Sequence, residues 1–172
     1  DESLQEIMQT AVREAQKTIQ SEAPSSGTTL TAALVLGQQV TIAHVGDSRA
    51  YHLHPDGRSE VITRDHSLVK RLEELGHISE EEAENYPHRN VLYRALGQGE
   101  ILEPDVFTVA FPQTGYLMIC SDGLWGVVTD QDMHRMINEA PNLQRACQNL
   151  VEAANAAGGP DNISVIIAQM IG

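Results

Sequence analysis

Residues 28–63 read TTLTAALVLGQQVTIAHVGDSRAYHLHPDGRSEVIT, and the first half of this stretch has the pattern of a β-hairpin. Residues 28–36 are rich in threonine and branched apolar side chains, which favour extended backbone. Gly37 opens a short polar turn, and residues 40–45 return to an apolar β-rich pattern. Two such runs joined by a glycine-bearing turn predict a pair of antiparallel strands.

The second half of the stretch predicts another hairpin. Gly46-Asp47-Ser48 interrupts the apolar pattern, and a strand resumes over residues 49–54. Pro55-Asp56-Gly57 is a strong turn signal that leads into a return strand over residues 59–63. Further strands are predicted around residues 107–111, 116–120 and 163–168.

Helical patterns lie on both sides of these strands. Apolar residues recur at helical spacing over residues 3–22. Ser67 can cap a short helix that ends near Leu75, and Ser79 with Glu82 forms a capping-box pattern for a second one. Thr129 can cap a later helix, and residues 143–154 form another. Hairpin-linked strands with separate helices indicate an α+β fold, in which an antiparallel sheet pair is flanked by helices.

The composition limits the classes of function. The chain has 172 residues, which predicts one globular domain over residues 1–172. Its formal charge of −13 disfavours nucleic acid and anionic membranes as partners and attracts divalent cations, although acidity can also serve solubility alone. Cys120 and Cys147 fit no disulfide framework or metal motif, and no run is long enough for a membrane span, so we expect a cytoplasmic protein with reduced thiols.

Three aspartates stand at junctions between apolar runs and glycine-bearing turns. Asp122 follows the run that ends at Cys120, Asp161 precedes the final strand, and Asp47 lies between two strand patterns. Carboxylates held at strand ends suit a site for hard divalent cations. Aspartate is also a common turn residue, so each position alone is compatible with a purely structural role.

The histidines give weaker signals. His52 and His54 alternate along a strand and therefore share one face, so they could bind a soft metal, but their place beside a turn argues against ligation. His66 follows an acid at a strand end, where a local hydrogen bond is the simpler role. His134 has the pattern of a surface residue. Arg94 lies in the loop of residues 86–100, where we expect a solvated charge.

Five short segments occur here in the order found in one enzyme family. They are Ser26-Gly27-Thr28-Thr29, His44-Val45-Gly46-Asp47-Ser48-Arg49, Arg64-Asp65-His66-Ser67, Ser121-Asp122-Gly123-Leu124-Trp125 and Gly159-Pro160-Asp161-Asn162. The chain thereby resembles the type-2C metal-dependent protein serine/threonine phosphatases, the PPM family, and most closely its compact bacterial members. The likeness extends over nearly the whole chain.

The resemblance implies a four-layer αββα fold, an antiparallel β-sandwich with helix pairs outside. It implies a Mg²⁺ or Mn²⁺ pair, or three ions, with a bridging water that attacks phosphoserine or phosphothreonine in a phosphorylated protein substrate. Asp122 and Asp161 match metal ligands of the family, and Asp47 matches an acid that helps to bind a third ion. Residues 67–100 match the flap near the substrate, and Arg49 matches a structural position.

One part of the family pattern has no match here. The family's phosphate-binding arginine, its first Asp-Gly pair and its acid histidine come before the segment that matches Asp1 onward, so we assign no catalytic residue in this chain. Because the chain starts with Asp rather than Met, we interpret it as a piece of a longer protein that lacks the N-terminal strands. Such a piece is expected to self-associate or to bind a complementing segment, since exposed strand edges attract other strands.

Two hypotheses follow for the function. The first is a phosphoprotein phosphatase that is nearly inactive as this chain alone, because the bridging carboxylate is missing. The alternative is a catalytically dead, phosphatase-like domain that senses or scaffolds a partner. An arginine and an Asp-Gly strand upstream in the parent protein would favour the enzyme over the scaffold.

Overall fold

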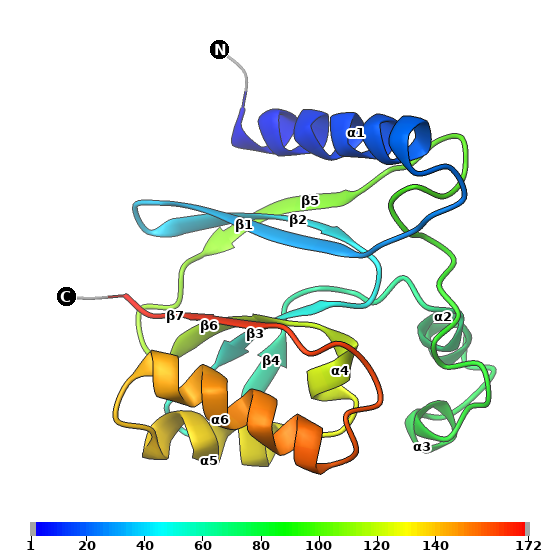
Figure 1. The fold of residues 1–172 in the computed structure, drawn as a ribbon. Coiled ribbons are helices and arrows are strands. Elements are labelled where there is room, and N and C mark those ends of the chain that lie inside the picture. Colours follow the sequence, from blue (N-terminus) through cyan, green and yellow to red (C-terminus); the bar gives the residue numbers. More distant parts are fainter. Residues whose placement is uncertain (1–2, 171–172) are drawn as a thin grey trace. The chain divides into compact units, whose positions relative to one another are not determined.

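A computed structural model describes residues 3–170 and contains two antiparallel sheets, each with helices of its own (Figure 1). One compact unit takes in the described residues up to Asp47 together with Arg64–Val109, and the other takes in Ser48–Thr63 and the described residues from Ala110 on. The elements are α1 Leu4–Glu22, β1 Leu30–Leu36, β2 Gln39–Val45, β3 Arg49–Leu53, β4 Ser59–Val61, α2 Leu68–Glu74, α3 Glu80–Glu84, β5 Asp105–Ala110, β6 Tyr116–Cys120, α4 Asp122–Trp125, α5 Asp130–Glu139, α6 Leu143–Ala156 and β7 Val165–Ala168.

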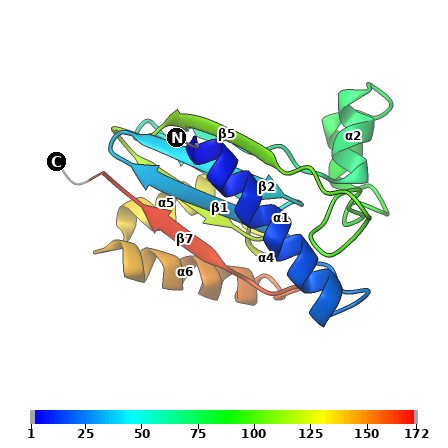
Figure 2. The ribbon, with the colours of Figure 1, turned by 90° about the horizontal axis from the view of Figure 1, so that it is seen from above.

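The first unit is built on a three-stranded sheet in the order β1-β2-β5. The predicted hairpin is confirmed, since β1 pairs antiparallel with β2 from Leu30↔Val45 to Leu36↔Gln39. Helix α1 packs along this sheet, and Figure 2 shows it crossing over β1 and β2. An apolar cluster joins the helix to the sheet and consists of Val12, Ala43, Val45, Leu96 and Leu102, with flanking apolar side chains. Burial of these side chains stabilises the helix where it lies.

Residues 67–100 of the same unit contain the two short helices that the capping patterns predicted. The Ser67 hydroxyl accepts from the amide of Lys70 at the start of α2. Ser79 and Glu82 form the expected capping box at the start of α3. The rest of this region has no named helix or strand, and isolated bridges pair Ser67 with Leu92 and Thr28 with Leu96. The Thr28–Leu96 bridge therefore ties the later part of the region to the rest of its unit, and the amide of His66, just before the region, donates to the carbonyl of Gly46 at 2.8 Å.

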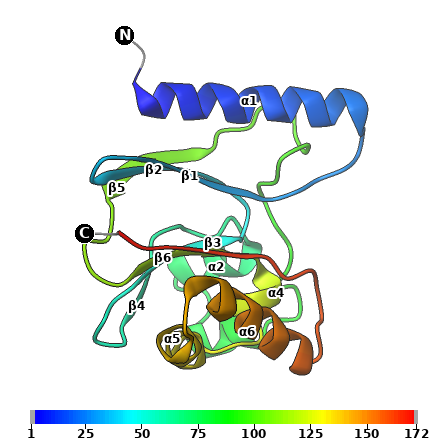
Figure 3. The ribbon, with the colours of Figure 1, turned by 60° about the vertical axis from the view of Figure 1, so that its left-hand side comes forward.

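The second unit is built on a four-stranded antiparallel sheet in the order β4-β3-β6-β7. Helices α5 and α6 pack against each other, and α6 also packs on β7 (Figure 3). A core of buried side chains fills the space between the helices and the sheet, and it includes Tyr51, Met118, Leu124, Met133 and Leu150. The predicted α+β class, with two antiparallel sheets and flanking helices, is confirmed.

Two sequence-based expectations in this unit differ from the structure. The short helix α4, which starts at Asp122, was not predicted, because its four residues are too few to show a periodic pattern. His134 was expected at the surface, which is wrong: it is buried, and its Nε2 donates to the carbonyl of Arg58 at 3.0 Å. Between residues 3 and 170, no helix combines the length and the apolar character needed to cross a membrane.

Candidate metal centre

Asp122 lies where strand β6 passes directly into helix α4. The strand ends at Cys120, Ser121 takes the N-cap position, and Asp122 is the first residue of the helix. Its side chain is partly exposed. The buried run of β6 thus fixes the backbone that carries this carboxylate, as a rigid site requires.

Ser121 fastens this junction to the segment that carries Asp161. Its hydroxyl donates to the carbonyl of Asn162 at 3.0 Å and accepts from the amide of Ser164 at 3.0 Å. The backbone amide of Ser121 donates to the carbonyl of Ser164 at 3.1 Å. Three hydrogen bonds therefore join the chain neighbours of Asp122 to the chain neighbours of Asp161, about forty residues later in the sequence.

Gly123 lets the two segments approach this closely. A Cβ atom at this position would lie 2.3 Å from the carbonyl oxygen of Asn162 and 2.9 Å from its carbonyl carbon. Real Cβ atoms essentially never come so close to backbone atoms, so only glycine fits here without displacement. The glycine after Asp122 is thus explained by the proximity of residues 161–163 rather than by a turn, since Gly123 does not have a positive φ.

Asp161 is exposed and stands in a short loop between α6 and β7. Gly158 and Gly159 precede it with φ angles of +116° and +51°, a conformation that favours glycine and that ends the helix sharply. One carboxylate oxygen of Asp161 accepts from the amide of Asn162 at 2.7 Å. A carboxylate offers about four acceptor positions, so this bond leaves oxygen lone pairs for a cation.

The structure therefore brings together the segments of Asp122 and Asp161, two of the three acids that the sequence singled out. Both belong to the second unit. Two carboxylates on adjoining, hydrogen-bonded segments are a donor set suited to Mg²⁺ or Mn²⁺, which prefer oxygen ligands.

The third acid, Asp47, belongs to the first unit and is buried with a relative exposure of 7%. It follows Gly46, whose φ of +108° requires glycine and whose missing Cβ would lie 2.4 Å from Cγ2 of Thr29. The Gly46 amide donates to Nδ1 of His66 at 3.1 Å, and the Gly46 carbonyl accepts from the His66 amide at 2.8 Å. The loop of Asp47 is thus held by two other motif segments, those of Thr29 and His66.

His66 continues into a polar network that the sequence did not reveal. Its Nε2 lies 3.1 Å from Oδ2 of Asp105, and Arg94 donates to the other carboxylate oxygen at 2.8 Å. Because Nδ1 accepts from an amide, His66 is neutral in this arrangement, and burial lowers its pKa. Partial burial raises the pKa of Asp105, but hydrogen bonds from His66 and Arg94 outweigh it and hold that pKa below its usual value.

Two sequence-based interpretations change as a result. Arg94 is not a solvated loop charge, since it forms an ion pair with Asp105. His66 makes hydrogen bonds to residues 20 and 39 positions away in the sequence rather than to near neighbours. Only the motif segment around His66 hinted at its importance, because contacts between distant residues leave no local periodic signal.

Arg49 and Trp125 form a stacked pair in the second unit. The guanidinium carbon of Arg49 lies 3.6 Å from the centroid of the Trp125 ring, close enough for a cation–π interaction. The same side chain reaches the hydroxyl of Tyr51 at 3.4 Å, and burial raises the pKa of that tyrosine. Burial also raises the pKa of Cys120 to about 12, which keeps this thiol protonated and unreactive.

Comparisons with known proteins identify the family of the chain. Residues 1–163 match the family described as Protein phosphatase 2C. The chain belongs to the protein phosphatase 2C family. The resemblance drawn from the five motif segments is thereby confirmed.

Similar proteins of the phosphatase 2C family come from bacteria. The chain is 38% identical to a serine/threonine phosphatase stp of Listeria innocua over 98% of its own length and 69% of that protein. It is 42% identical to a serine/threonine phosphatase stp of Listeria welshimeri over 83% of its length, but spans only 56% of that relative. A solved structure of the catalytic domain of the phosphatase PstP in complex with two manganese ions is 32% identical, with a TM-score of 0.82 over 97% of this chain and 71% of that chain.

Proposed function

We propose that this chain forms the part of a protein phosphatase 2C domain in which Asp122 and Asp161 bind a shared set of divalent cations. The observation that carries the proposal is the group of three hydrogen bonds from Ser121 to Asn162 and Ser164, with the close approach at Gly123. These contacts hold the two carboxylate-bearing segments together before any ion arrives, as a preorganised metal site requires.

The cations we propose are Mg²⁺ or Mn²⁺. The carboxylates supply hard oxygen donors, which these ions prefer over nitrogen and sulfur. A bound divalent pair lowers the pKa of a water so that it can attack a phosphate ester at neutral pH. The role of Asp122 and Asp161 is to hold the cations, and the binding of a further ion by Asp47 stays a prediction from the family resemblance. The manganese ions of the solved PstP structure support this choice of metal.

The proposed substrate is a protein phosphorylated on serine or threonine, and the proposed role is in signalling. The relatives named serine/threonine phosphatases support this class of substrate. We propose a cytoplasmic location on the basis of the two free cysteines, Cys120 and Cys147, which suit a reducing compartment.

We also propose that residues 67–100 act as a flap that contacts the substrate protein. The two short helices α2 and α3 lie between Ser67 and Leu92, which form a bridge with each other, and the Thr28–Leu96 bridge ties the chain beyond them to the rest of the unit. A segment anchored at both ends and built from short helices can adjust locally without loss of the sheet beneath it. Reduced hydrogen exchange in residues 67–100 on addition of a phosphopeptide tests this assignment.

The metal assignment is tested by titration calorimetry with Mn²⁺. We expect the chain to bind Mn²⁺ weakly, with a Kd on the order of 0.1–1 mM, the range of hard-cation sites with few charged ligands. Asp122→Asn and Asp161→Asn should each weaken binding at least about tenfold. Glu139→Gln removes one carboxylate charge from the exposed end of α5 and should leave binding unchanged.

Equal heats of Mn²⁺ binding for Asp122→Asn and the parent chain would show that Asp122 is not a ligand of the cations. Activity is measured separately with p-nitrophenyl phosphate in the presence of Mn²⁺. We expect little turnover by the chain alone, because two carboxylates provide only part of the ligand shell that a divalent pair needs. Rapid turnover would contradict that expectation without affecting the assignment of the ligands.

A further inference from the structure

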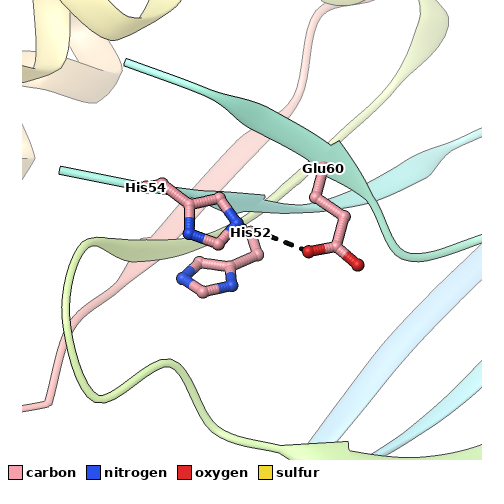
Figure 4. Close-up of side chains that lie close together, drawn as sticks. All are labelled: His52, His54 and Glu60. Carbon is pink, nitrogen blue, oxygen red and sulfur yellow. Dashed lines mark hydrogen bonds and ion pairs between the residues drawn. The ribbon is translucent and has the colours of Figure 1, made fainter. Parts of the chain in front are cut away.

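A second group of metal-ligating side chains lies on the β3–β4 hairpin, apart from the aspartates described above. His52, His54 and Glu60 each offer a ligand atom, and these three atoms lie within 4.8 Å of one another. Figure 4 shows the two imidazole rings stacked, with Glu60 beside them. Their ring centroids are 3.7 Å apart, and the ring planes are tilted by 31°.

The sheet register explains why these side chains meet. His52 and His54 are two residues apart and so point to the same face of the sheet. Glu60 in β4 is the direct antiparallel partner of His52, which places its side chain on that face as well. The amide of His54 donates to the carbonyl of Arg58 at 2.8 Å, so the pairing continues to the end of the hairpin.

The hydrogen bond of His52 selects which of its nitrogens can bind a metal. Its Nε2 lies 3.1 Å from the carbonyl oxygen of Thr114, which can only accept. Nε2 is therefore protonated, and Nδ1 carries the lone pair. Histidine ligands in metal sites commonly donate their second ring N–H to a backbone carbonyl in this way, because the contact fixes both the tautomer and the ring.

The spacing of the other two ligands also fits a metal site. Nε2 of His54 lies 3.4 Å from Oε2 of Glu60. Two ligands bound to Zn²⁺ at about 2.0–2.1 Å with tetrahedral geometry stand roughly 3.3 Å apart. His54 is largely shielded, with a side-chain exposure of 18%, whereas Glu60 is open at 68%, so an ion can enter from the side of the carboxylate.

We propose that His52, His54 and Glu60 form a binding site for a borderline divalent transition metal, Zn²⁺ being the best match. Two imidazoles and one carboxylate are a three-ligand set that leaves a fourth position for water. Nitrogen donors disfavour Mg²⁺, so this site is chemically distinct from an all-oxygen centre. The ion would join β3 to β4 and stabilise the hairpin, since it binds the folded pairing and not the unfolded chain.

The experiment is calorimetric titration of the 172-residue chain with Zn²⁺ in a buffer that contains millimolar Mg²⁺. The expected result is one Zn²⁺ per chain, with binding unaffected by the Mg²⁺. His54→Ala and Glu60→Gln should each weaken Zn²⁺ binding at least about tenfold, since loss of even an outer partner of a ligand commonly costs 10–100-fold. His77→Ala, which removes an exposed histidine outside the cluster, should bind like the parent chain.

Two further variants separate this site from other places where Zn²⁺ could bind. Asp122→Asn should retain Zn²⁺ binding, whereas a loss would place the ion at the aspartate centre instead. Cys147→Ser should also retain it, and this result would exclude the partly exposed thiol of Cys147 as the ligand of the ion. Absence of stoichiometric Zn²⁺ binding, displacement by Mg²⁺, or unchanged affinity in both His54→Ala and Glu60→Gln would overturn the proposal.

Discussion

Replacement of Gly123 by alanine sets two physical effects against each other. Gly123 lies inside α4, where alanine is intrinsically favoured over glycine by up to about 1 kcal/mol. Helix propensity alone therefore predicts that Gly123→Ala stabilises the protein. The contact with Asn162 predicts the opposite, because the new Cβ would lie 2.3 Å from a backbone carbonyl oxygen.

The magnitude follows from the size of this overlap. Carbon–oxygen contacts of this kind are ordinarily about 3.3 Å long, so the two segments must separate by about 1 Å. Overpacking of this kind costs about 1–3 kcal/mol. After subtraction of about 1 kcal/mol for the gain in propensity, we expect a net loss of up to about 2 kcal/mol in the free energy of unfolding. The same displacement moves Asp122 away from Asp161, so Mn²⁺ affinity should fall at least about tenfold.

Urea denaturation measures the first effect, and Mn²⁺ calorimetry measures the second. Trp125 is the only tryptophan and lies two residues from the substitution, so its fluorescence reports on this region. Gly27→Ala is the matched control, because the three atoms nearest to the Cβ it adds all belong to the movable side chain of Gln98. If Gly123→Ala is as stable as the parent and binds Mn²⁺ equally well, the close approach does not position the two aspartates.

Three other outcomes follow from the structure. Ser121→Ala removes a hydroxyl that makes two hydrogen bonds and should lower the free energy of unfolding by about 1–2 kcal/mol. Ser59→Ala is its control and should change the free energy of unfolding by less than about 0.5 kcal/mol, because the buried Ser59 hydroxyl has no hydrogen-bond partner among the described residues. Equal losses in urea denaturation would contradict the assigned role of Ser121. Burial and the neighbouring imidazole lower the pKa of His44 to about 4, so the unfolded chain binds the extra proton and stability must fall as the pH drops below about 6.5. Between pH 7 and pH 5 the protonation of His44 should lower the free energy of unfolding by about 2 kcal/mol. His44→Gln should therefore make the free energy of unfolding depend less steeply on pH, and an unchanged dependence would show that other groups cause it. Arg49→Lys loses the planar stacking on Trp125 and should cost about 0.5–1 kcal/mol with a shift in tryptophan emission, while an unaltered spectrum would argue against the stacked pair.

The elements that could be predicted from the sequence are those set by local chemistry. The turn at Gly37 and the capping box of Ser79 and Glu82 are short-range signals, and the hairpin and the helix they predicted are present. The position of Asp122 at the end of a strand was also predicted, because an apolar run precedes it. Helix α4 was missed, since it is a single turn that contains a glycine.

The contacts that shape the site could not be predicted in this way. The hydrogen bonds of Ser121 reach 41 and 43 residues along the chain, and the bond of His66 to Asp105 reaches 39. Pairings over such distances are fixed by the packing of the whole unit and leave no local pattern. The motif segments indicated where such contacts occur, but only the structure reveals which residues are the partners. Arg94 was interpreted as a solvated charge because its partner, Asp105, could not be recognised from the sequence.

The central claim is that Asp122 and Asp161 bind the same set of cations. A double-mutant cycle tests it most directly, with Mn²⁺ affinity measured for the parent chain, Asp122→Asn, Asp161→Asn and the double variant. If the two carboxylates share the ions, either single change removes most of the binding and the double variant is little worse, which gives a coupling free energy of about 1 kcal/mol or more. Strictly additive losses would mean that the two aspartates act independently, and the account of a shared metal centre would be wrong.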